Sequence, residues 1–392
     1  MIIFNYPNIV CGGIHTLLLR LCSELKNRGI QTEILYRNIF EQGKTDYLNS
    51  NIDIYQYSKE LPSHYFKNQI HSIITFEFGT YVETVAFIKK IKSRSKVFLY
   101  SVHPYTFDYY FKDPGLKIGL IKSFFSPSFC RCIAKGIVNG YMFFMDEETL
   151  EHSIVENNVL LDENEYDSKI VRLIFPCTNK EGKENKTIQL LSVSRADFPF
   201  KGYLKGLIEI FSKLKERYNN LSLTIISSGN DLDKLEEWIK ESNSKISLVK
   251  NVSYSDLFEF YKKSNIYIGM GTTVLEAASE SNIVIPVSPY TYECKSDGLF
   301  SDNPKWLLTE IDSGNSIENM LKNLIEMPST RFKDLSNDSL NKLQELYSSE
   351  VVINSLINIL DKADTVKQYK ELPLVYLLMK RISKLLRLKF KD

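Results

Sequence analysis

Short apolar runs alternate with segments of helical periodicity along almost all of the 392 residues. In the first half, the runs IIFNY, TEILYR, SIITFE, KVFLYSV, GYMFFM and IVRLIF are typical of buried strands. After the first run comes GIHTLLLRLCSELKNRG, in which Leu17, Leu18, Leu21 and Leu25 share one helical face and Gly29 ends the pattern. Because strands that alternate with helices form βαβ units, the sequence predicts an α/β fold with parallel sheets.

The alternation is interrupted at TNKEGKENKT (178–187), which is rich in charge and poor in apolar residues. Beyond it, the pattern restarts with IQLLSVS and continues through three further strand-and-helix repeats. A chain of this length suits two domains. We therefore predict a doubly wound Rossmann-like domain over residues 1–177, a linker over 178–187 and a second such domain over 188–365, facing each other across a central cleft.

Composition excludes several classes of protein. The formal net charge of +1 argues against a nucleic-acid binder, which normally carries a basic excess. The six cysteines are scattered without a zinc-binding pattern, as in a reduced cytoplasmic protein. Neither a signal peptide nor a run of about 20 apolar residues is evident, so we expect a cytoplasmic location.

Two glycine-rich turns stand between a strand and a helix. Gly12 and Gly13 precede the first helix, and Gly269, Gly271, Thr272 and Thr273 precede a helix that carries Glu276. Such turns aim backbone N–H groups and the positive end of a helix dipole at an anion. The first turn lacks the G-x-G-x-x-G spacing of dinucleotide sites and also fits a plain tight turn. Glu276 could bind the hydroxyls of a ribose, or merely complement the helix dipole.

The stretch SRADFPFKG carries two cations at the predicted end of a strand. Arg195 leaves the strand and Lys201 opens the next helix. A guanidinium donates two hydrogen bonds to phosphate oxygens and an ammonium acts as a point charge, so the pair suits a diphosphate. The alternative is that both side chains cover a solvated face.

The order of these motifs resembles glycosyltransferase family 4, whose members are retaining nucleotide-sugar enzymes with the GT-B fold. The resemblance covers residues 1 to about 304. The stretch IGMGTTVLEA is similar to the family's E-x7-E segment, in which Glu276 matches the second glutamate, the residue that binds the donor ribose. Gly271 and Thr272 match backbone positions that meet the donor sugar and phosphates. Ile268 stands where the family has its first glutamate, which puts the usual contact to the sugar ring in doubt.

The resemblance also implies roles for other residues. Arg195 and Lys201 match the basic pair that neutralises the diphosphate leaving group, and Gly13 matches a loop glycine near the donor phosphate. His103, which follows the strand KVFLYSV, lies where the family often has a histidine lining the sugar site. His15 is a weaker candidate on the acceptor side.

No cofactor or metal is expected. As the bond to the nucleoside diphosphate breaks, fixed positive groups can stabilise the charge that grows on the bridging oxygen. The D-x-D pattern that holds a metal in the other nucleotide-sugar fold occurs only at 231–233, where it fits the first turn of a helix. The donor would be a UDP-sugar or GDP-sugar, and retention of configuration is implied by the resemblance alone.

Residues 366–392 end the chain with a basic amphipathic pattern. Such a helix can lie on an anionic membrane surface, on the inner face of the cytoplasmic membrane, or pack back on the first domain. Together these features predict a hexosyltransferase-type enzyme of EC class 2.4 that extends a lipid-linked bacterial glycan such as O-antigen, capsule or lipopolysaccharide core. A catalytically silent partner subunit that binds nucleotide or glycan is the alternative, and a nucleotide-sugar epimerase is less favoured because Ile268 removes an acidic group.

Overall fold

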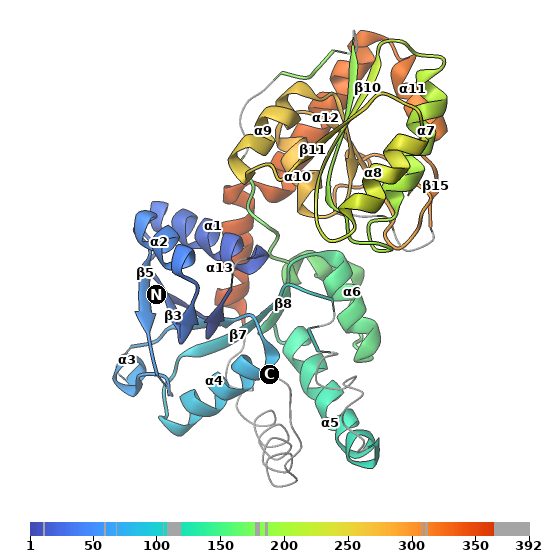
Figure 1. The fold of residues 1–392 in the computed structure, drawn as a ribbon. Helices are drawn as coiled ribbons and strands as arrows, with labels where there is room; N and C mark the ends of the chain where they lie inside the picture. The colour runs from blue at the N-terminus through green and yellow to red at the C-terminus, as the bar shows by residue number, and fades with distance from the viewer. Residues whose placement is uncertain are drawn as a thin grey trace. The chain divides into compact units, whose positions relative to one another are not determined.

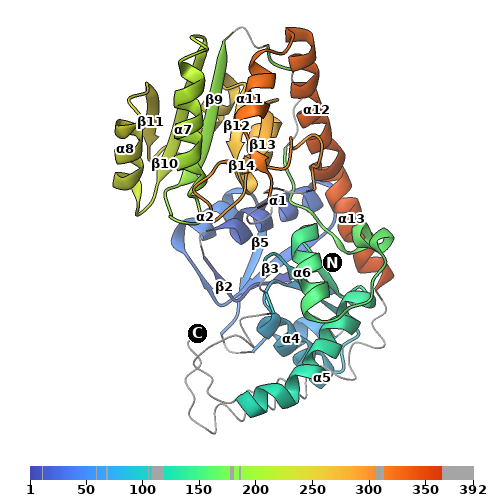
Figure 2. The ribbon, with the colours of Figure 1, turned by 90° about the vertical axis from the view of Figure 1, so that its right-hand side faces the viewer.

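The computed structural model describes residues 1–10, 12–58, 60–67, 69–104, 106–107, 119–176, 181–184, 187–305, 307, 309 and 313–363. The predicted C-terminal helix over 366–392 lies outside the described residues. The chain divides into two compact units (Figures 1 and 2). The first contains Met1–Ile174 and the segment that begins at Ser349, and the second contains Phe175–Ser348.

The first unit is built on a six-stranded parallel sheet with the spatial order β5, β3, β1, β6, β7, β8. Its strands are β1 (Ile2–Asn5), β3 (Thr32–Tyr36), β5 (Asp53–Gln56), β6 (Ser72–Thr75), β7 (Lys96–Ser101) and β8 (Met142–Phe144). Two short strands, β2 (Asn8–Ile9) and β4 (Asn38–Ile39), pair beside it. Its helices are α1 (Gly13–Asn27), α2 (Glu41–Asn49), α3 (Ser63–Lys67), α4 (Phe78–Lys90), α5 (Gly119–Val138), α6 (Glu147–Glu156), the 3-10 helix η2 (Glu163–Lys169) and α13 (Ser349–Lys362).

The second unit repeats this plan with five parallel strands in the order β11, β10, β9, β12, β13. They are β9 (Ile188–Arg195), β10 (Leu221–Ser228), β11 (Ile246–Lys250), β12 (Ile266–Gly269) and β13 (Ile283–Pro286). Figure 1 shows α7 (Tyr203–Lys215), α8 (Leu232–Glu241) and α11 (Glu318–Ile325) on one face of the sheet. The other face carries α9 (Tyr254–Lys263), α10 (Thr272–Ser279) and α12 (Ser329–Tyr347), and a small antiparallel pair joins β14 (Lys295–Ser296) to β15 (Asn315–Ser316).

Both sheets are doubly wound. In each, the strand order reverses beside the first strand, between β1 and β6 in the first unit and between β9 and β12 in the second. Open α/β sheets bind ligands outside the carboxyl ends of the strands at such a switch point. The two switch points therefore locate the candidate sites.

The apolar pattern correctly located most of the core. The four predicted leucines of α1 are buried, as are Ile266 and Ile268 of β12. The expected strand IVRLIF is buried but adds to the sheet only through a bridge between Phe144 and Ile170. Strand β5 was not predicted, because an edge strand with mostly exposed side chains lacks an apolar run.

Two predicted domain boundaries differ from the structure. The second domain was expected to run to residue 365, but α13 belongs to the first unit, where Arg28 of α1 donates hydrogen bonds to Ser349 and Asn354. At its other end, the Lys96 ammonium donates to the carbonyl oxygens of Leu360 and Ala363. A charged side chain at a helix carboxyl terminus satisfies carbonyl groups that the helix leaves open, so both ends of α13 are fixed.

Part of the predicted linker packs on the second unit. Of its ten residues, the structure describes 181–184 and 187, which lie in the second unit. The Lys183 ammonium donates to the carbonyl oxygens of Tyr261 and Ser264, at the end of α9, and its backbone N–H donates to the Ser336 hydroxyl. This charged segment therefore packs against α9 and α12 and acts as a helix cap.

Candidate functional site

The cations predicted at the end of β9 lie at the switch point of the second unit. Arg195 is the last residue of β9, and its side chain is 73% exposed, with Nε 3.3 Å from Oδ2 of Asp197. The backbone N–H of Lys201 donates to the carbonyl oxygen of Asp197, which closes the turn into α7. The Lys201 ammonium lies 4.5 Å from the centre of the Phe200 ring.

Lys201 is electrostatically unusual. Burial and, to a smaller extent, the charge of Arg195 lower its pKa to about 8, and Asp197 opposes this shift. An anion bound near the ammonium would favour the protonated form and raise this pKa. Near pH 7 Lys201 is therefore mostly protonated, and an anionic partner would stabilise that form, which fits the predicted contact to a diphosphate.

The glycine-rich turn between β12 and α10 lies beside these cations, because β12 pairs directly with β9. Gly271 has a φ of +75°, a left-handed conformation that favours glycine, and a Cβ there would meet open space. At Gly269 a Cβ would lie 2.3 Å from the Tyr267 hydroxyl oxygen. The two glycines therefore serve different purposes. Gly271 permits the backbone conformation of the turn, and Gly269 leaves room for the buried Tyr267.

The Tyr267 side chain, which was not predicted as a site residue, contacts the turn through its hydroxyl. Its hydroxyl oxygen lies 2.5 Å from Oγ1 of Thr273 and 3.2 Å from the carbonyl oxygen of Val193 on β9. Thr273 in turn donates to the carbonyl oxygen of Met270. Thr273 was predicted as a donor-binding residue, and in the structure its hydroxyl contacts other residues of the turn. Thr272 is exposed at the first position of α10.

Glu276 is buried, and its Oε2 accepts a hydrogen bond of 2.9 Å from the hydroxyl of Tyr261 on α9. The phenol keeps the carboxylate fixed one turn into α10, as a buried charged group requires. Ile268, at the position of the family's first glutamate, has no exposed surface and belongs to the hydrophobic core. Of the two carboxylates in the E-x7-E pattern, this chain has the second alone.

Asp231 has a role that the sequence did not predict. It lies in the D-x-D stretch expected to start a helix, and α8 indeed begins at Leu232. Its Oδ2 accepts a hydrogen bond of 2.8 Å from the backbone N–H of Phe198, and its own N–H donates to the carbonyl oxygen of Ala196. Asp231 therefore holds the loop that carries Arg195 and Lys201. No sequence signal distinguishes this role from an ordinary helix start.

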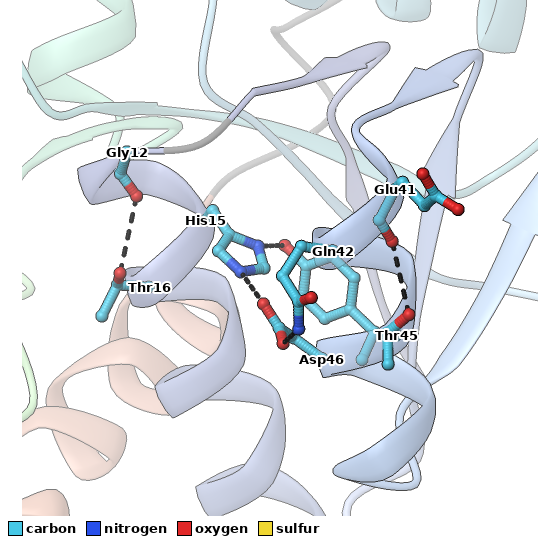
Figure 3. A network of polar contacts seen from close by, with 8 residues as sticks. Gly12, His15, Thr16, Glu41, Gln42, Thr45 and Asp46 are labelled. Carbon is cyan, nitrogen blue, oxygen red and sulfur yellow. Dashed lines mark hydrogen bonds and ion pairs between the residues drawn. The ribbon is translucent and has the colours of Figure 1, made fainter. Parts of the chain in front are cut away.

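The first unit contains the second glycine-rich turn, at the start of α1. A Cβ at Gly12 or Gly13 would meet no atom within 4 Å, and no side chain caps the helix. Behind the turn, the imidazole of His15 is buried, with Nδ1 3.0 Å from the Tyr47 hydroxyl and Nε2 3.0 Å from Asp46 (Figure 3). Both ring nitrogens of His15 are thus engaged within the protein, which joins α1 to α2.

Asp46 completes this network from α2. The Gln42 amide donates to its Oδ1 at 2.7 Å, and this hydrogen bond, together with the His15 contact, lowers the pKa of Asp46 (Figure 3). Because an ionised carboxylate only accepts, His15 donates from Nε2, and a neutral imidazole then accepts from Tyr47 at Nδ1. The histidine expected to face an acceptor therefore orients the start of α1.

His103 follows β7, as predicted, and lies in a tight turn. The Thr106 hydroxyl and backbone N–H both donate to the His103 carbonyl oxygen. The imidazole is exposed, yet the surrounding protein desolvates it enough to lower its pKa; Asp146 opposes this shift and His152 adds to it. His103 should therefore be neutral at pH 7.

We expect the His103 resonance to titrate with a midpoint below 6.5 in a proton NMR pH series, because desolvation disfavours the imidazolium. The protein has five histidines, and the signal that disappears in His103→Gln identifies the residue. Asp146→Asn should lower the midpoint further, since Asp146 favours the charged form. A midpoint above 6.5 would contradict this electrostatic description.

The structure thus gathers the predicted residues into two sets. In the second unit, Arg195 and Lys201 lie beside the turn at Gly269–Thr273, at the ends of neighbouring strands. In the first unit, Gly12 and Gly13 follow the short strand β2, and His103 follows β7 of the six-stranded sheet. In the described part of the chain, no group of three His, Cys, Asp or Glu side chains could hold a metal ion. No helix among the described residues is long and apolar enough to cross a membrane.

Comparison with known proteins agrees with this geometry. Residues 177–292 match the family model for glycosyl transferases group 1. Solved structures match nearly the whole chain: a glycosyltransferase from Rickettsia africae is 14% identical over 92% of this chain and 98% of its own, with a TM-score of 0.61. The fold is GT-B. No curated protein matches the sequence.

Two further structures contain ligands. S. aureus TarM, crystallised with fondaparinux, alpha-GlcNAc-glycerol and UDP, is 11% identical, covering 92% of this chain and 99% of its own, with a TM-score of 0.57. Anabaena HepE, in complex with UDP and glucose, is 11% identical over the same shares, with a TM-score of 0.56. At these identities the likeness concerns the GT-B fold.

Proposed function

We propose that this protein is a glycosyltransferase that moves a sugar from a nucleoside-diphosphate sugar to a glycan acceptor. The proposal rests on two cations, Arg195 and Lys201, that lie close enough for the charge of Arg195 to lower the pKa of Lys201. Both lie beside the start of α10, which no side chain caps. Two fixed cations and a helix amino terminus suit a diphosphate. The match of residues 177–292 to glycosyl transferases group 1 supports the same reaction.

The mechanism follows from where charge develops. When the bond between the anomeric carbon and the diphosphate breaks, the electron pair stays on the bridging oxygen. Arg195 and Lys201 would stabilise that oxygen, and the N–H groups at the start of α10 would bind the remaining phosphate oxygens. Glu276, fixed by Tyr261, would accept hydrogen bonds from the ribose.

Further details of the proposal rest on the resemblance to family 4. The reaction would retain the anomeric configuration and need no metal, because the two cations carry the charge of the leaving group. With Ile268 in the core, the donor sugar would be held without the first glutamate. We propose a cytoplasmic enzyme that adds a hexose to a lipid-linked surface polysaccharide at the membrane.

A catalytically silent protein that binds nucleotide or glycan is the second candidate. The absence of the first E-x7-E carboxylate at Ile268 favours it. The two candidates predict the same nucleotide binding and differ in turnover, since a silent protein would consume no donor.

Titration calorimetry with UDP and with GDP, without added metal, tests the shared step. We expect one nucleotide to bind, and Arg195→Ala and Lys201→Ala to weaken it by about tenfold or more each, since a charged hydrogen bond contributes about 1.5–3 kcal/mol. Lys205→Ala, which changes a half-exposed lysine on α7, is the matched control and should leave the affinity unchanged. Absence of binding by both nucleotides would overturn the proposed donor site.

A further inference from the structure

A group of five aromatic side chains lies on the second unit, two of them exposed and three partly buried against the hydrophobic core. Three separate segments contribute to this group, which we call the aromatic platform: Phe198 and Phe200 before α7, Trp238 on α8, and Tyr290 and Tyr292 in the loop between β13 and β14. Tyr290 is 56% exposed and Tyr292 is 41% exposed. Exposed aromatic groups of this kind commonly mark binding surfaces.

The rings form two groups, in which neighbouring rings are tilted or edge-on to each other. Phe198 lies 4.5 Å from Trp238, which lies 5.9 Å from Tyr292. Phe200 lies 4.9 Å from Tyr290. The Tyr290 backbone N–H also donates to the carbonyl oxygen of Phe200, which ties the two segments together.

Two glycines hold the tyrosine loop in place. A Cβ at Gly202 would lie 2.6 Å from the Thr291 carbonyl oxygen, and one at Gly206 would lie 2.4 Å from the Cys294 nitrogen. Gly202 and Gly206 are one helical turn apart, so the loop backbone lies directly on the start of α7. The loop is therefore a packed part of the unit, and it presents its tyrosines on a fixed support.

The conformation of Tyr290 is costly for a purely structural residue. Its φ is +59°, in the left-handed region where a bulky side chain is an outlier. Glycine would suit this backbone better, yet a large ring stands here and is mostly exposed. Strained backbone of this type persists chiefly where the side chain serves binding or catalysis.

The charges near the platform favour a neutral polar ligand. The Lys234 ammonium lies 5.4 Å from the centre of the Trp238 ring and 5.8 Å from those of Phe198 and Tyr292. An exposed carboxylate, Glu293, is next to Tyr292 and forms an ion pair of 2.6 Å with the Lys295 ammonium, so that cationic and anionic groups both border the rings. Sugars suit this mixture, because their C–H faces stack on aromatic rings while their hydroxyls bond to ammonium and carboxylate groups.

We propose that the aromatic platform binds a sugar ring of the glycan acceptor. Lys201, whose ammonium lies over Phe200, connects the platform to the cations assigned to the donor diphosphate. That the bound sugar belongs to the acceptor rests on the proposed function. Glycan binding by the platform can be measured without turnover.

The test uses a double variant, Tyr290→Gly with Tyr292→Ala, and labelled full-length protein on an array of bacterial surface glycans. Glycine fits the φ of +59°, so we expect the melting temperature to hold or rise while both exposed rings are lost. Glycan binding should fall about tenfold or more, because the variant removes both exposed rings on which the sugar would stack. Tyr290→Phe with Tyr292→Phe keeps both rings and should keep binding.

Several results would contradict the assignment of the aromatic platform to a sugar. Equal glycan binding by the wild type and the double variant, or no array glycan bound by the wild type, would overturn the platform assignment. Binding to phosphatidylethanolamine and phosphatidylglycerol vesicles that the double variant loses, without glycan binding, would assign these rings to a membrane instead. Calorimetry with UDP and GDP separates the two proposals, because the double variant should retain the nucleotide affinity of the wild type.

Discussion

Replacing Lys201 by alanine should lower turnover by about a hundredfold or more, because removal of one fixed donor to the developing charge costs about 3–4 kcal/mol. The measurement is steady-state transfer from the donor sugar whose nucleotide binds in calorimetry. The ammonium makes its described contacts with a ring face and neighbouring charges, so the melting temperature should change little. Lys205→Ala, on α7, should retain turnover.

The pH dependence gives this prediction a second readout. With a pKa of about 8, Lys201 loses its proton as the pH rises through 8, and nucleotide affinity should decline over the same range. In Lys201→Ala that decline should be absent. Wild-type turnover in the variant, or an unchanged pH profile of binding, would remove Lys201 from the site.

Replacing Arg172 by methionine should destabilise the first unit by about 3–5 kcal/mol, because it breaks a buried ion pair by removing its cation. The Arg172 guanidinium contacts Glu147 at the start of α6, and their side chains are 8% and 6% exposed. Asp167 lies 3.5 Å from the same guanidinium but is largely exposed. Urea unfolding, followed by a signal from each unit, measures the loss.

A double variant distinguishes the buried charge from simple packing. Arg172→Met with Glu147→Leu replaces the ion pair by apolar groups and should recover most of the lost stability. The exposed pair Lys342 and Glu345 on α12 supplies the control, since Lys342→Met should change the free energy of unfolding by less than about 1 kcal/mol. A loss below about 1 kcal/mol in Arg172→Met would contradict a buried, mutually dependent pair.

The positions of Arg195, Lys201 and the Gly269–Thr273 turn were predictable because each follows a strong strand pattern. Carboxyl ends of neighbouring parallel strands meet at one sheet edge, and β12 does pair with β9. The side-chain contacts were not predictable. Thr273 was expected to face the donor, but its hydroxyl is held by Tyr267, a residue that reads as core in the sequence.

Contacts between residues far apart in the chain were also not predictable from the sequence. His15 contacts Asp46 and Tyr47 on α2, some thirty positions away, and no local pattern relates an acidic helix face to a distant imidazole. The exposed rings of Tyr290 and Tyr292 were likewise indistinguishable from ordinary core aromatics. Their exposure depends on how the loop lies against Gly202 and Gly206.

By itself, the sequence determined the two parallel sheets, the order of their strands and helices, and the turns that end at the site. Periodicity and glycine positions are local properties, and they act through backbone conformation and apolar burial. The tertiary structure alone decided that α13 returns to the first unit, that Asp231 holds the Phe198 loop and that burial beside Arg195 lowers the pKa of Lys201. These features depend on which side chains approach through space, where hydrogen bonds and desolvation act.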